Sequence, residues 1–298
     1  METLTEGAFA KLNLTLDVLR KRDDGYHDLQ MILQTISLRD DVTITLGTGE
    51  PWAVHCYRET AKENGELELN TDGFPQDGEN LAWKAAKAYF ERTGKDPGGL
   101  EIFISKRIPA QSGLGGGSAD AAAVFRALDR HDGNPLSIPA LCELGFTVGC
   151  DVPFCVLRGT ALVEGRGELL TKLPDAPDMY YVVCKPDFSI STPELFGGID
   201  SRAIARRPEQ KTMMANLQRG DLLGIGGSLC NVFEPVVMEK HFEINYIKSV
   251  MFTYGAYGAQ MTGTGSAVFG IFDSFEYATV ACTMLKDRFP QVFLTTNV

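Results

Sequence analysis

Apolar and polar residues alternate near the start of the chain, in the pattern of a strand with one buried face. Within residues 7–17, the leucines from Leu12 to Leu16 share one face, and Lys11 and Asn13 fall on the other. Side chains two residues apart on a strand point in the same direction. Lys11 and Asn13 therefore either form a solvated polar face or project together into a binding site, and the pattern leaves both interpretations open.

A helix is predicted over residues 79–94, where apolar residues recur at helical spacing. Asn80 can cap its start and Gly94 can end it. Earlier in the chain, residues 28–46 hold two apolar segments, and the charged sequence Arg39–Asp41 predicts a turn between them. The remaining pattern predicts strands over 100–108, 180–186, 267–272 and 292–296, a hairpin over 159–170, and helices over 119–130, 137–148, 212–218, 234–250 and 274–289, with a further helix starting at 191.

Mixed strands and helices over 298 residues predict two domains. The stretch from Leu173 to Asp178 contains two prolines and two aspartates, so it is the predicted boundary. This gives an N-terminal domain over residues 1–174 and a C-terminal domain over residues 175–298.

The net charge of −11 and the pI near 4.9 limit the partners to be expected. An acidic surface repels nucleic acid and anionic lipid, so neither is predicted as a partner. No apolar run approaches the length of a membrane span, and the first residues lack the pattern of a signal peptide, so we expect a cytoplasmic protein. The seven cysteines form no Cys-x-x-Cys pair and the four histidines show no metal-ligand spacing, which favours free thiols and no structural zinc site.

A glycine-rich segment over residues 109–123 connects a predicted strand to an alanine-rich helix. Glycines allow backbone conformations that other residues avoid, and they leave room for a ligand. A helix start behind such a loop presents unpaired N–H groups and the positive end of the helix dipole, which favour an anion such as phosphate. Ser118 can cap this helix or offer its hydroxyl to a phosphate or a magnesium ion. The residues predicted to hold a nucleotide here are Pro109, Gly113, Leu114, Gly115, Gly116, Gly117, Ser118 and Ala119.

This glycine loop departs from two common phosphate-binding patterns. A Walker A loop has a lysine directly after its last glycine, and none follows here. A Rossmann loop has the pattern Gly-x-Gly-x-x-Gly, but Ser118 stands where the last glycine belongs. A flexible surface loop is the remaining alternative, and the predicted strand and helix on either side argue against it.

Two further segments carry candidate chemistry. Tyr26 and His27 follow Gly25 at a predicted turn, where they either stack on and hydrogen-bond a flat ring or form an ordinary strand edge. Asp151 lies after a helix end and before Pro153. It is therefore either a local cap or turn acceptor, or a carboxylate at the mouth of a site.

Three segments together carry a family resemblance: AKLNLTL from residue 10, PAQSGLGGGSADAAA from residue 109 and MTGTGSAVFGIF from residue 261. In this order, and over nearly the whole chain, they resemble the GHMP kinase superfamily of small-molecule kinases. The resemblance implies an α+β protein with the two-domain GHMP kinase fold. Its N-terminal α+β domain would be ribosomal-protein-S5-like, its C-terminal domain a ferredoxin-like α/β sandwich, and its active site would lie in the interdomain cleft.

A closer resemblance rests on AKLNLTLDV, RDDGYHDLQMILQ, VGCDVPF and EGRGE. These segments are most similar to kinases of a cytidine-diphosphate-linked methylerythritol. That similarity implies ATP-dependent phosphorylation of the substrate's 2-hydroxyl, a step of non-mevalonate isoprenoid and terpenoid precursor biosynthesis.

The resemblance also implies roles for individual residues. Asp151 would be the catalytic carboxylate that takes the proton of the substrate hydroxyl or orients it, and Lys11 would stand beside it. The glycine loop would hold the phosphates of ATP, with Mg²⁺ as a second cofactor and Ser118 as its candidate ligand. Tyr26 and His27 would recognise cytosine, with Phe196 as a second stacking ring. The full set of implied substrate-binding residues is Asn13, Tyr26, His27, Thr192, Phe196, Thr264 and Gly265.

Two alternative functions stay open at this level. The chain can be another kinase of the same superfamily, acting on homoserine or mevalonate, or a ligand-sensing protein of this fold without turnover. A cytosine site needs an aromatic ring with a hydrogen-bonding neighbour, so the Tyr26-His27 pair favours the cytidine substrate. The sequence leaves both a monomer and a homodimer open.

Overall fold

The computed structural model describes residues 1–61 and 67–298. These residues pack into two compact units, each built from several segments of the chain. Unit 1 comprises Met1–Ala10, Leu38–Ala110 and Gly115–Leu157, and unit 2 comprises Lys11–Ser37, Gln111–Leu114 and Arg158–Val298. Two long strands, β1 (Glu2–Lys21) and β2 (His27–Leu46), contribute residues to both units, as does the glycine loop. The division between residues 174 and 175 stays a prediction.

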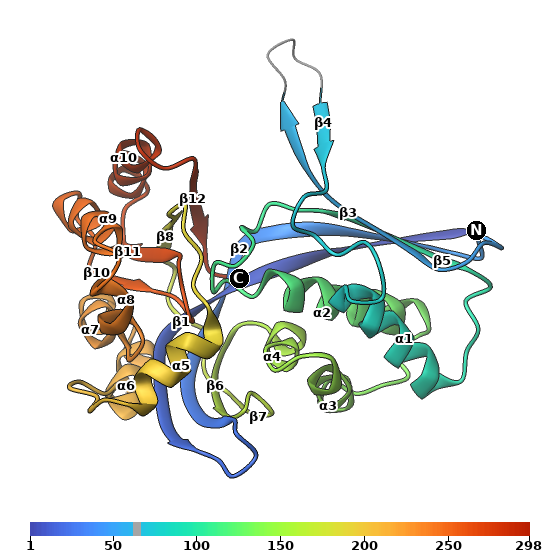
Figure 1. The fold of residues 1–298 in the computed structure, drawn as a ribbon, viewed down its shortest axis with the longest axis horizontal. Coiled ribbons are helices and arrows are strands. Elements are labelled where there is room, and N and C mark those ends of the chain that lie inside the picture. The colour runs from blue at the N-terminus through green and yellow to red at the C-terminus, as the bar shows by residue number, and fades with distance from the viewer. Residues whose placement is uncertain (62–66) are drawn as a thin grey trace. The chain divides into compact units, whose positions relative to one another are not determined.

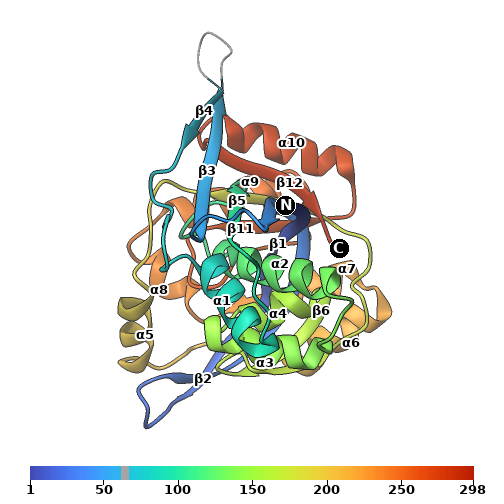
Figure 2. The same cartoon turned by 90° about the vertical axis from the view of Figure 1, so that its right-hand side faces the viewer.

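Unit 1 is a layer of strands with helices on one face, as Figures 1 and 2 show. Its strand order is β4-β3-β5-β2-β1, in which β5 is antiparallel to β2 and parallel to β3. Large side chains from the helices, Tyr89, Phe125 and Phe154, are fully buried in its core. Besides parts of β1 and β2, the elements are β3 (Ala53–Ala61), β4 (Leu67–Asn70), α1 (Leu81–Thr93), β5 (Leu100–Ser105), α2 (Gly116–His131), α3 (Ile138–Val148) and α4 (Val152–Leu157).

The helix predicted over residues 79–94 is confirmed as α1, together with both of its ends. The side chain of Asn80 accepts a hydrogen bond from the backbone N–H of Ala82, at 2.9 Å. Gly94 ends the helix with a φ of 70°, a left-handed conformation that glycine adopts without strain. Local cap signals therefore predict this helix well.

The turn predicted at Arg39–Asp41 is wrong, because β2 runs through these residues without a break. Asp40 is fully buried. Its carboxylate forms an ion pair with Lys106 and accepts hydrogen bonds from the backbone N–H groups of Arg107 and Ile108. A partner 66 residues away thus makes a charged residue compatible with the middle of a buried strand.

Unit 2 contains a four-stranded sheet of order β10-β11-β8-β12, with α9 and α10 packed along one face (Figure 1). Tyr181, Phe269 and Phe272 of this sheet are fully buried. The predicted hairpin over 159–170 is confirmed as β6 and β7, and β6 also pairs with β2. The elements of unit 2, besides parts of β1 and β2, are β6 (Thr160–Gly165), β7 (Leu169–Lys172), β8 (Tyr180–Lys185), α5 (Thr192–Asp200), α6 (Gln210–Arg219), α7 (Leu222–Ser228), β9 (Cys230–Asn231), α8 (Glu234–Met238), α9 (Glu243–Thr253), β10 (Gly258–Met261), β11 (Val268–Phe272), α10 (Phe275–Lys286) and β12 (Gln291–Thr296).

The single helix predicted over residues 234–250 is wrong, because the structure has two helices there, α8 and α9. Glu234 is drawn inward at the start of α8, where its carboxylate accepts the backbone N–H of Met261 at 2.6 Å. The long apolar pattern did not distinguish one continuous helix from two short helices with different partners.

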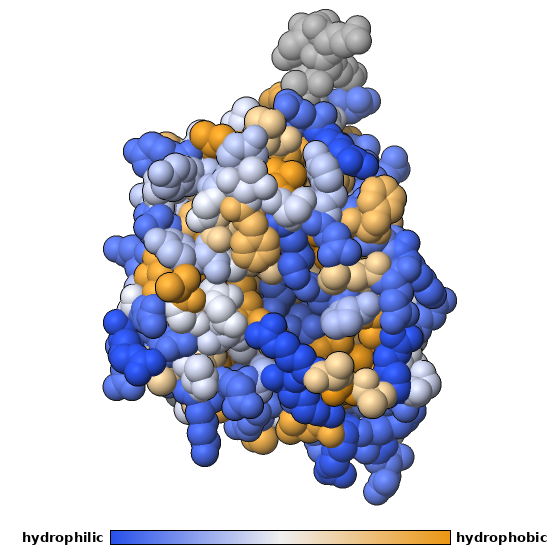
Figure 3. Space-filling model, turned by 90° about the vertical axis from the view of Figure 1, so that its left-hand side faces the viewer, coloured by the Kyte–Doolittle hydropathy of each residue, from blue (hydrophilic) through white to orange (hydrophobic). Residues whose placement is uncertain are grey.

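The surface of one face of the molecule is shown in Figure 3. Apolar areas on this face are scattered and are separated by polar ones, without joining into one continuous area. Among the residues described, no helix combines the length and the hydropathy that a membrane crossing requires.

Candidate active site

The polar face of β1 lies inside unit 2 and is not solvated. The side chains of Lys11 and Asn13 are 4% and 0% exposed. Lys11 Nζ donates a hydrogen bond to Asn13 Oδ1 at 2.8 Å. The hydroxyl of Thr262 accepts from the backbone N–H of Asn13 at 3.0 Å and donates to Asn13 Oδ1 at 3.2 Å. Of the two interpretations of the strand pattern, the structure therefore excludes the solvated face.

The two glycine segments meet beside this lysine within unit 2. A Cβ added to Gly113 would lie only 2.2 Å from the carbonyl oxygen of Thr262, and Gly113 has a φ of 79°. A Cβ added to Gly263 would lie 2.9 Å from the carbonyl oxygen of Gly113 and 3.3 Å from Lys11 Nζ. Glycine is thus required at both positions, because any side chain would separate the two segments. The two backbones form one close-packed wall, which at Gly263 lies next to the ammonium group of Lys11.

Two polar residues that the sequence did not single out, Asn231 and Gln260, hold this wall in place. Asn231 Nδ2 donates to the carbonyl oxygens of Met261 and Gly263, both at 2.8 Å. Gln260 Nε2 donates to the carbonyl oxygen of Asn13 at 3.0 Å. Isolated asparagine and glutamine residues belong to no motif, so the sequence carried no signal for their positions. Only the fold brings Asn231 to this place, because β9 pairs in parallel with β1 and sets Asn231 opposite Leu16.

A cluster of rings forms where the β1–β2 turn meets α5, all within unit 2. The rings of His27 and Phe196 are stacked, with centroids 4.6 Å apart and planes inclined by 27°. His27 is buried, whereas Tyr26 remains 54% exposed. Of the three predicted ring residues, the structure therefore brings His27 and Phe196 into contact and leaves Tyr26 open to solvent on the same turn.

Arg166 covers Tyr26, and Thr192 meets Thr264. The guanidinium carbon of Arg166 lies 4.0 Å from the centroid of the Tyr26 ring, a cation–π contact. The hydroxyl groups of Thr192 and Thr264 are 3.3 Å apart. These contacts link the hairpin tip between β6 and β7 to the β1–β2 turn, and the start of α5 to the second glycine segment.

The helix predicted behind the first glycine loop is confirmed as α2 in unit 1, but it starts at Gly116, three residues before the predicted start, and its cap differs. Gly115 is the capping residue, with a φ of 74°, and no side chain caps this end. Ser118 lies in the first turn, so the interpretation of Ser118 as the cap is wrong and its hydroxyl serves no capping bond. The first N–H groups of a helix have no acceptor within it. Gly116 and Gly117 pack against Ile108 and Leu81, whose side chains a Cβ would meet at 3.1 and 3.5 Å.

Three charged side chains lie buried behind this helix start. Lys106 Nζ is 2.5 Å from Asp40 Oδ2 and 2.5 Å from Asp120 Oδ2, and none of the three side chains is more than 5% exposed. Burial opposes the charged form of Lys106, yet the two carboxylates outweigh it and raise the pKa of Lys106. Burial also raises the pKa of Asp120, although Lys106 opposes this. The Asp40 carboxylate acts on both groups in the same direction, because a nearby negative charge favours a bound proton, although burial is the larger cause of the raised pKa of Asp120.

Asp151 lies in the turn between α3 and α4 and is half-buried. The neighbouring Gly149 is close to Ser118, since a Cβ on Gly149 would lie 3.9 Å from Ser118 Oγ. Gly149 thus lies close to the first turn of α2 within unit 1, and Asp151 follows two residues later in the chain. Lys11 belongs to unit 2, and its pairing with Asp151 stays a prediction.

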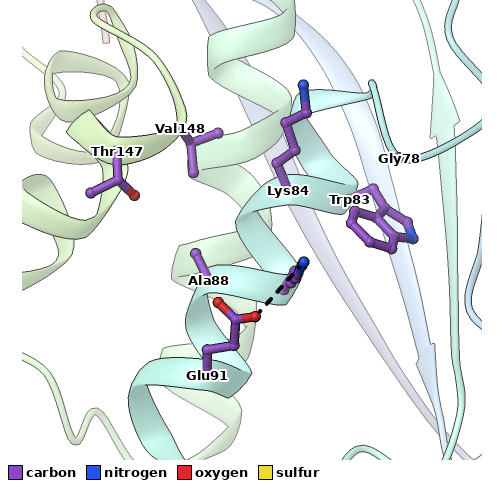
Figure 4. Close-up of a pocket in the computed structure, with 8 residues that line it drawn as sticks. Gly78, Trp83, Lys84, Ala88, Glu91, Thr147 and Val148 are labelled. Atoms are coloured by element: carbon purple, nitrogen blue, oxygen red, sulfur yellow. Dashed lines mark ion pairs between the residues drawn. The ribbon is translucent and has the colours of Figure 1, made fainter.

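A separate hollow of about 360 Å³ lies along α1 (Figure 4). The ammonium of Lys87 pairs with Glu91, four residues further along the same helix, at 3.8 Å. No predicted site residue lines this hollow. Its walls are Gly78, Trp83, Lys84, Lys87, Ala88 and Glu91, with Thr147 and Val148 at the end of α3.

Comparison with known proteins places this architecture in a family. Residues 80–159 match the GHMP kinases N terminal domain, and residues 213–291 match the GHMP kinases C terminal domain. The chain is 40% identical over 290 residues to the 4-diphosphocytidyl-2-C-methyl-D-erythritol kinase of Caldicellulosiruptor saccharolyticus, an alignment that covers 97% of this chain and 95% of the relative. The chain belongs to the 4-diphosphocytidyl-2-C-methyl-D-erythritol kinase family.

Other members and solved structures agree with this assignment. The 4-diphosphocytidyl-2-C-methyl-D-erythritol kinase of Clostridium tetani is 36% identical over 98% of this chain and 99% of its own. A crystal structure of 4-(cytidine 5'-diphospho)-2C-methyl-D-erythritol kinase superposes with a TM-score of 0.77 at 30% identity, covering 98% of both chains. The homoserine kinase from Cytophaga hutchinsonii also gives 0.77, at 20% identity over 100% of this chain and 95% of its own, and shows a shared fold. The predicted two-domain GHMP kinase fold is thereby confirmed.

Proposed function

We propose that the protein transfers the γ-phosphoryl group of ATP to the 2-hydroxyl of 4-(cytidine 5'-diphospho)-2-C-methyl-D-erythritol. One structural observation carries the proposal within the family assignment. In unit 2, β1 and β2 carry both the buried Lys11-Asn13 pair among the glycine segments and the Tyr26-His27 pair beside Phe196. The residues proposed for phosphoryl transfer and those proposed to bind a flat base would thus share one pair of strands.

The ring cluster would bind the cytosine base. Tyr26 is exposed on a turn and is held by Arg166, so it offers a ring face to a ligand. Phe196 stacks on His27 and supplies a second aromatic surface. Stacking of a base on an aromatic side chain is worth about 1–3 kcal/mol. Such an arrangement has no purpose for a small hydroxy acid, so it favours a cytidine substrate over homoserine or mevalonate.

The buried polar pair of β1 would hold the reacting part of the substrate. Asn13 is oriented by Thr262 and by Lys11, so its amide has a fixed direction. Lys11 would stabilise the negative charge that develops on the transferring group. Asp151 would take the proton of the substrate hydroxyl or orient it. Thr192, Thr264 and Gly265, where α5 meets the second glycine segment, would complete the binding of the substrate.

The start of α2 would hold the phosphates of ATP. Gly115, Gly116 and Gly117 add no side chains of their own beside its first N–H groups, and the helix dipole adds positive potential. Pro109, Gly113, Leu114 and Ala119 would complete the loop on either side of the helix start.

Mg²⁺ would enter bound to the phosphates of ATP. Among the described residues, no three His, Cys, Asp or Glu side chains gather as a metal site. This fits an ion that keeps several waters and binds mainly to phosphates. The side chain proposed to bind Mg²⁺ is Ser118. Its hydroxyl lies near Gly149. The ion would neutralise phosphate charge.

The test is ADP release from purified protein with ATP and Mg²⁺, measured by a coupled assay. The cytidine compound, homoserine and mevalonate are offered separately. Turnover with the cytidine compound alone is expected. Turnover with homoserine or mevalonate alone would overturn the substrate, and ATP binding without any turnover would favour a ligand-sensing protein.

A further inference from the structure

Two residues on one face of α5 contact the ring of His27. Phe196 and Asp200 are four residues apart on α5, so they lie on the same side of the helix. Phe196 stacks on the imidazole ring at 4.6 Å, and Asp200 Oδ1 lies 2.7 Å from His27 Nε2. The ring is therefore fixed in its plane by one residue and in its rotation by the other.

Asp200 decides which nitrogen of His27 carries hydrogen. Its second oxygen lies 2.7 Å from the ammonium of Lys21, which donates to it. The hydrogen bond from Lys21, and then that from His27, lower the pKa of Asp200. An ionised carboxylate only accepts hydrogen bonds. His27 Nε2 must therefore donate, and it must carry a hydrogen.

The other ring nitrogen is left for a ligand. Among the residues that the structure describes, none is hydrogen-bonded to His27 Nδ1. Lys21 already provides a positive charge beside Asp200, so the imidazole does not have to be charged to satisfy the carboxylate. In the neutral form with hydrogen on Nε2, Nδ1 has a lone pair and accepts a hydrogen bond.

We propose that Asp200 is a positioning residue that fixes His27 as the Nε2–H tautomer and turns Nδ1 into an acceptor for the 4-amino group of cytosine. This proposal rests on the proposed function for the identity of the base. The 4-amino group of cytosine donates to such a nitrogen, whereas the 4-carbonyl oxygen of uracil is repelled by it. Asp200 therefore contributes to selecting cytidine over uridine without touching the base.

The tautomer is tested directly, and independently of any substrate, by two-bond ¹H–¹⁵N NMR of the histidine rings at pH 8. A His27→Gln variant identifies the signals of His27. In the wild-type protein the hydrogen is expected on Nε2 alone. In Asp200→Ala the signals are expected to show a mixture of both tautomers. A wild-type spectrum with hydrogen on Nδ1, or a spectrum unchanged in Asp200→Ala, would overturn the proposal.

Selectivity is tested by kinetics and by inhibition with CDP and UDP. We expect Asp200→Ala to raise KM for the cytidine substrate about tenfold, with kcat and KM for ATP changed less than about twofold. CDP is expected to inhibit the wild-type enzyme about tenfold more strongly than UDP, and this preference should largely disappear in the variant. Asp200→Asn has nearly the same shape but can also donate to Nε2, so it should act in the same direction if Asp200→Ala does not fold.

Arg202→Ala provides the matched control. Arg202 lies just beyond the end of α5 and pairs with Glu239 at 2.7 Å, whereas His27 is held by Asp200 and Phe196. Its loss should leave KM and the CDP preference unchanged. An equal change in both variants would show that any loosening of α5 has the same effect, and it would overturn the specific role of Asp200. Absence of wild-type turnover with the cytidine compound would instead refute the proposed function, while the NMR result would still decide the tautomer.

Discussion

Replacing Lys106 by methionine is expected to destabilise unit 1 strongly. Methionine resembles lysine in length and shape, so the change removes the charge and little of the packing. The ammonium of Lys106 lies 2.5 Å from carboxylate oxygens of both Asp40 and Asp120, and all three side chains are at most 5% exposed. The variant would leave two carboxyl groups buried without a counter-charge.

The expected loss is about 4 kcal/mol at pH 8. Removing one partner of a buried ion pair costs about 3–5 kcal/mol, because the remaining charge stays buried. Two buried carboxyl groups are left here, which increases the loss of stability. The loss is limited because Asp120 can bind a proton and Asp40 still accepts hydrogen bonds from the backbone N–H groups of Arg107 and Ile108. Since domains are held folded by about 5–15 kcal/mol, this is a large part of the total.

Urea unfolding followed by tryptophan fluorescence reports on the stability of unit 1, which contains Lys106. The chain has two tryptophans, Trp52 and Trp83, and both lie in unit 1 with ring centroids 5.9 Å apart. Lys87→Met is the control. Lys87 is exposed and its contact with Glu91 is 3.8 Å long, so its loss should cost less than about 0.5 kcal/mol.

A loss below about 1 kcal/mol for Lys106→Met would show that Lys106 is not needed as a counter-charge for the two buried carboxyls. A second change provides an internal check. Adding Asp120→Asn removes one of the two uncompensated carboxyls, so the double variant should be more stable than Lys106→Met alone. If the two changes were simply additive, Lys106 and Asp120 would not be energetically coupled.

Four further predictions follow from the same structure. Gly113→Ala should lower the melting temperature and cost at least ~1 kcal/mol, because the added methyl group meets the Thr262 carbonyl at 2.2 Å; an unchanged melting temperature would contradict the packing described. Asp151→Asn should lower kcat by about 100-fold or more while ATP still binds, and wild-type turnover would remove Asp151 from the mechanism. Tyr26→Ala should raise KM for the cytidine substrate about tenfold and leave KM for ATP unchanged, whereas equal increases in both would argue against a base-stacking role. Burial raises the pKa of Asp120 from 3.8 to about 7, so the native state holds a proton that the unfolded state releases. The stability of the wild-type protein should therefore fall as the pH rises through this range, and Asp120→Asn should remove this fall. Superimposable curves of stability against pH for the two proteins would show that Asp120 is not its source.

Local signals in the sequence predicted much of the fold. Asn80 and Gly94 marked both ends of α1, and the glycine run marked the start of α2 to within three residues. These features depend on backbone conformation and on hydrogen bonds between residues close in the chain. They can therefore be recognised without knowledge of the rest of the structure.

Non-local contacts account for what the sequence could not show. The charged residues at Arg39–Asp41 indicated a turn, but Asp40 is held in a continuous strand by Lys106, and no nearby residue announces that partner. The same holds for the candidate site. The resemblance to a family identified Lys11, whereas Asn231 and its bonds to the second glycine segment emerged only from the pairing of β9 with β1.

The proposed reaction phosphorylates one hydroxyl of a cytidine-diphosphate-linked methylerythritol. ³¹P NMR of the product formed with ATP and Mg²⁺ tests it most directly. We expect one new phosphomonoester signal, from a phosphate on the 2-hydroxyl, beside an intact diphosphate and one equivalent of ADP, and no such signal with Asp151→Asn. A phosphate on another hydroxyl, or product formed equally well by the Asp151→Asn variant, would contradict it.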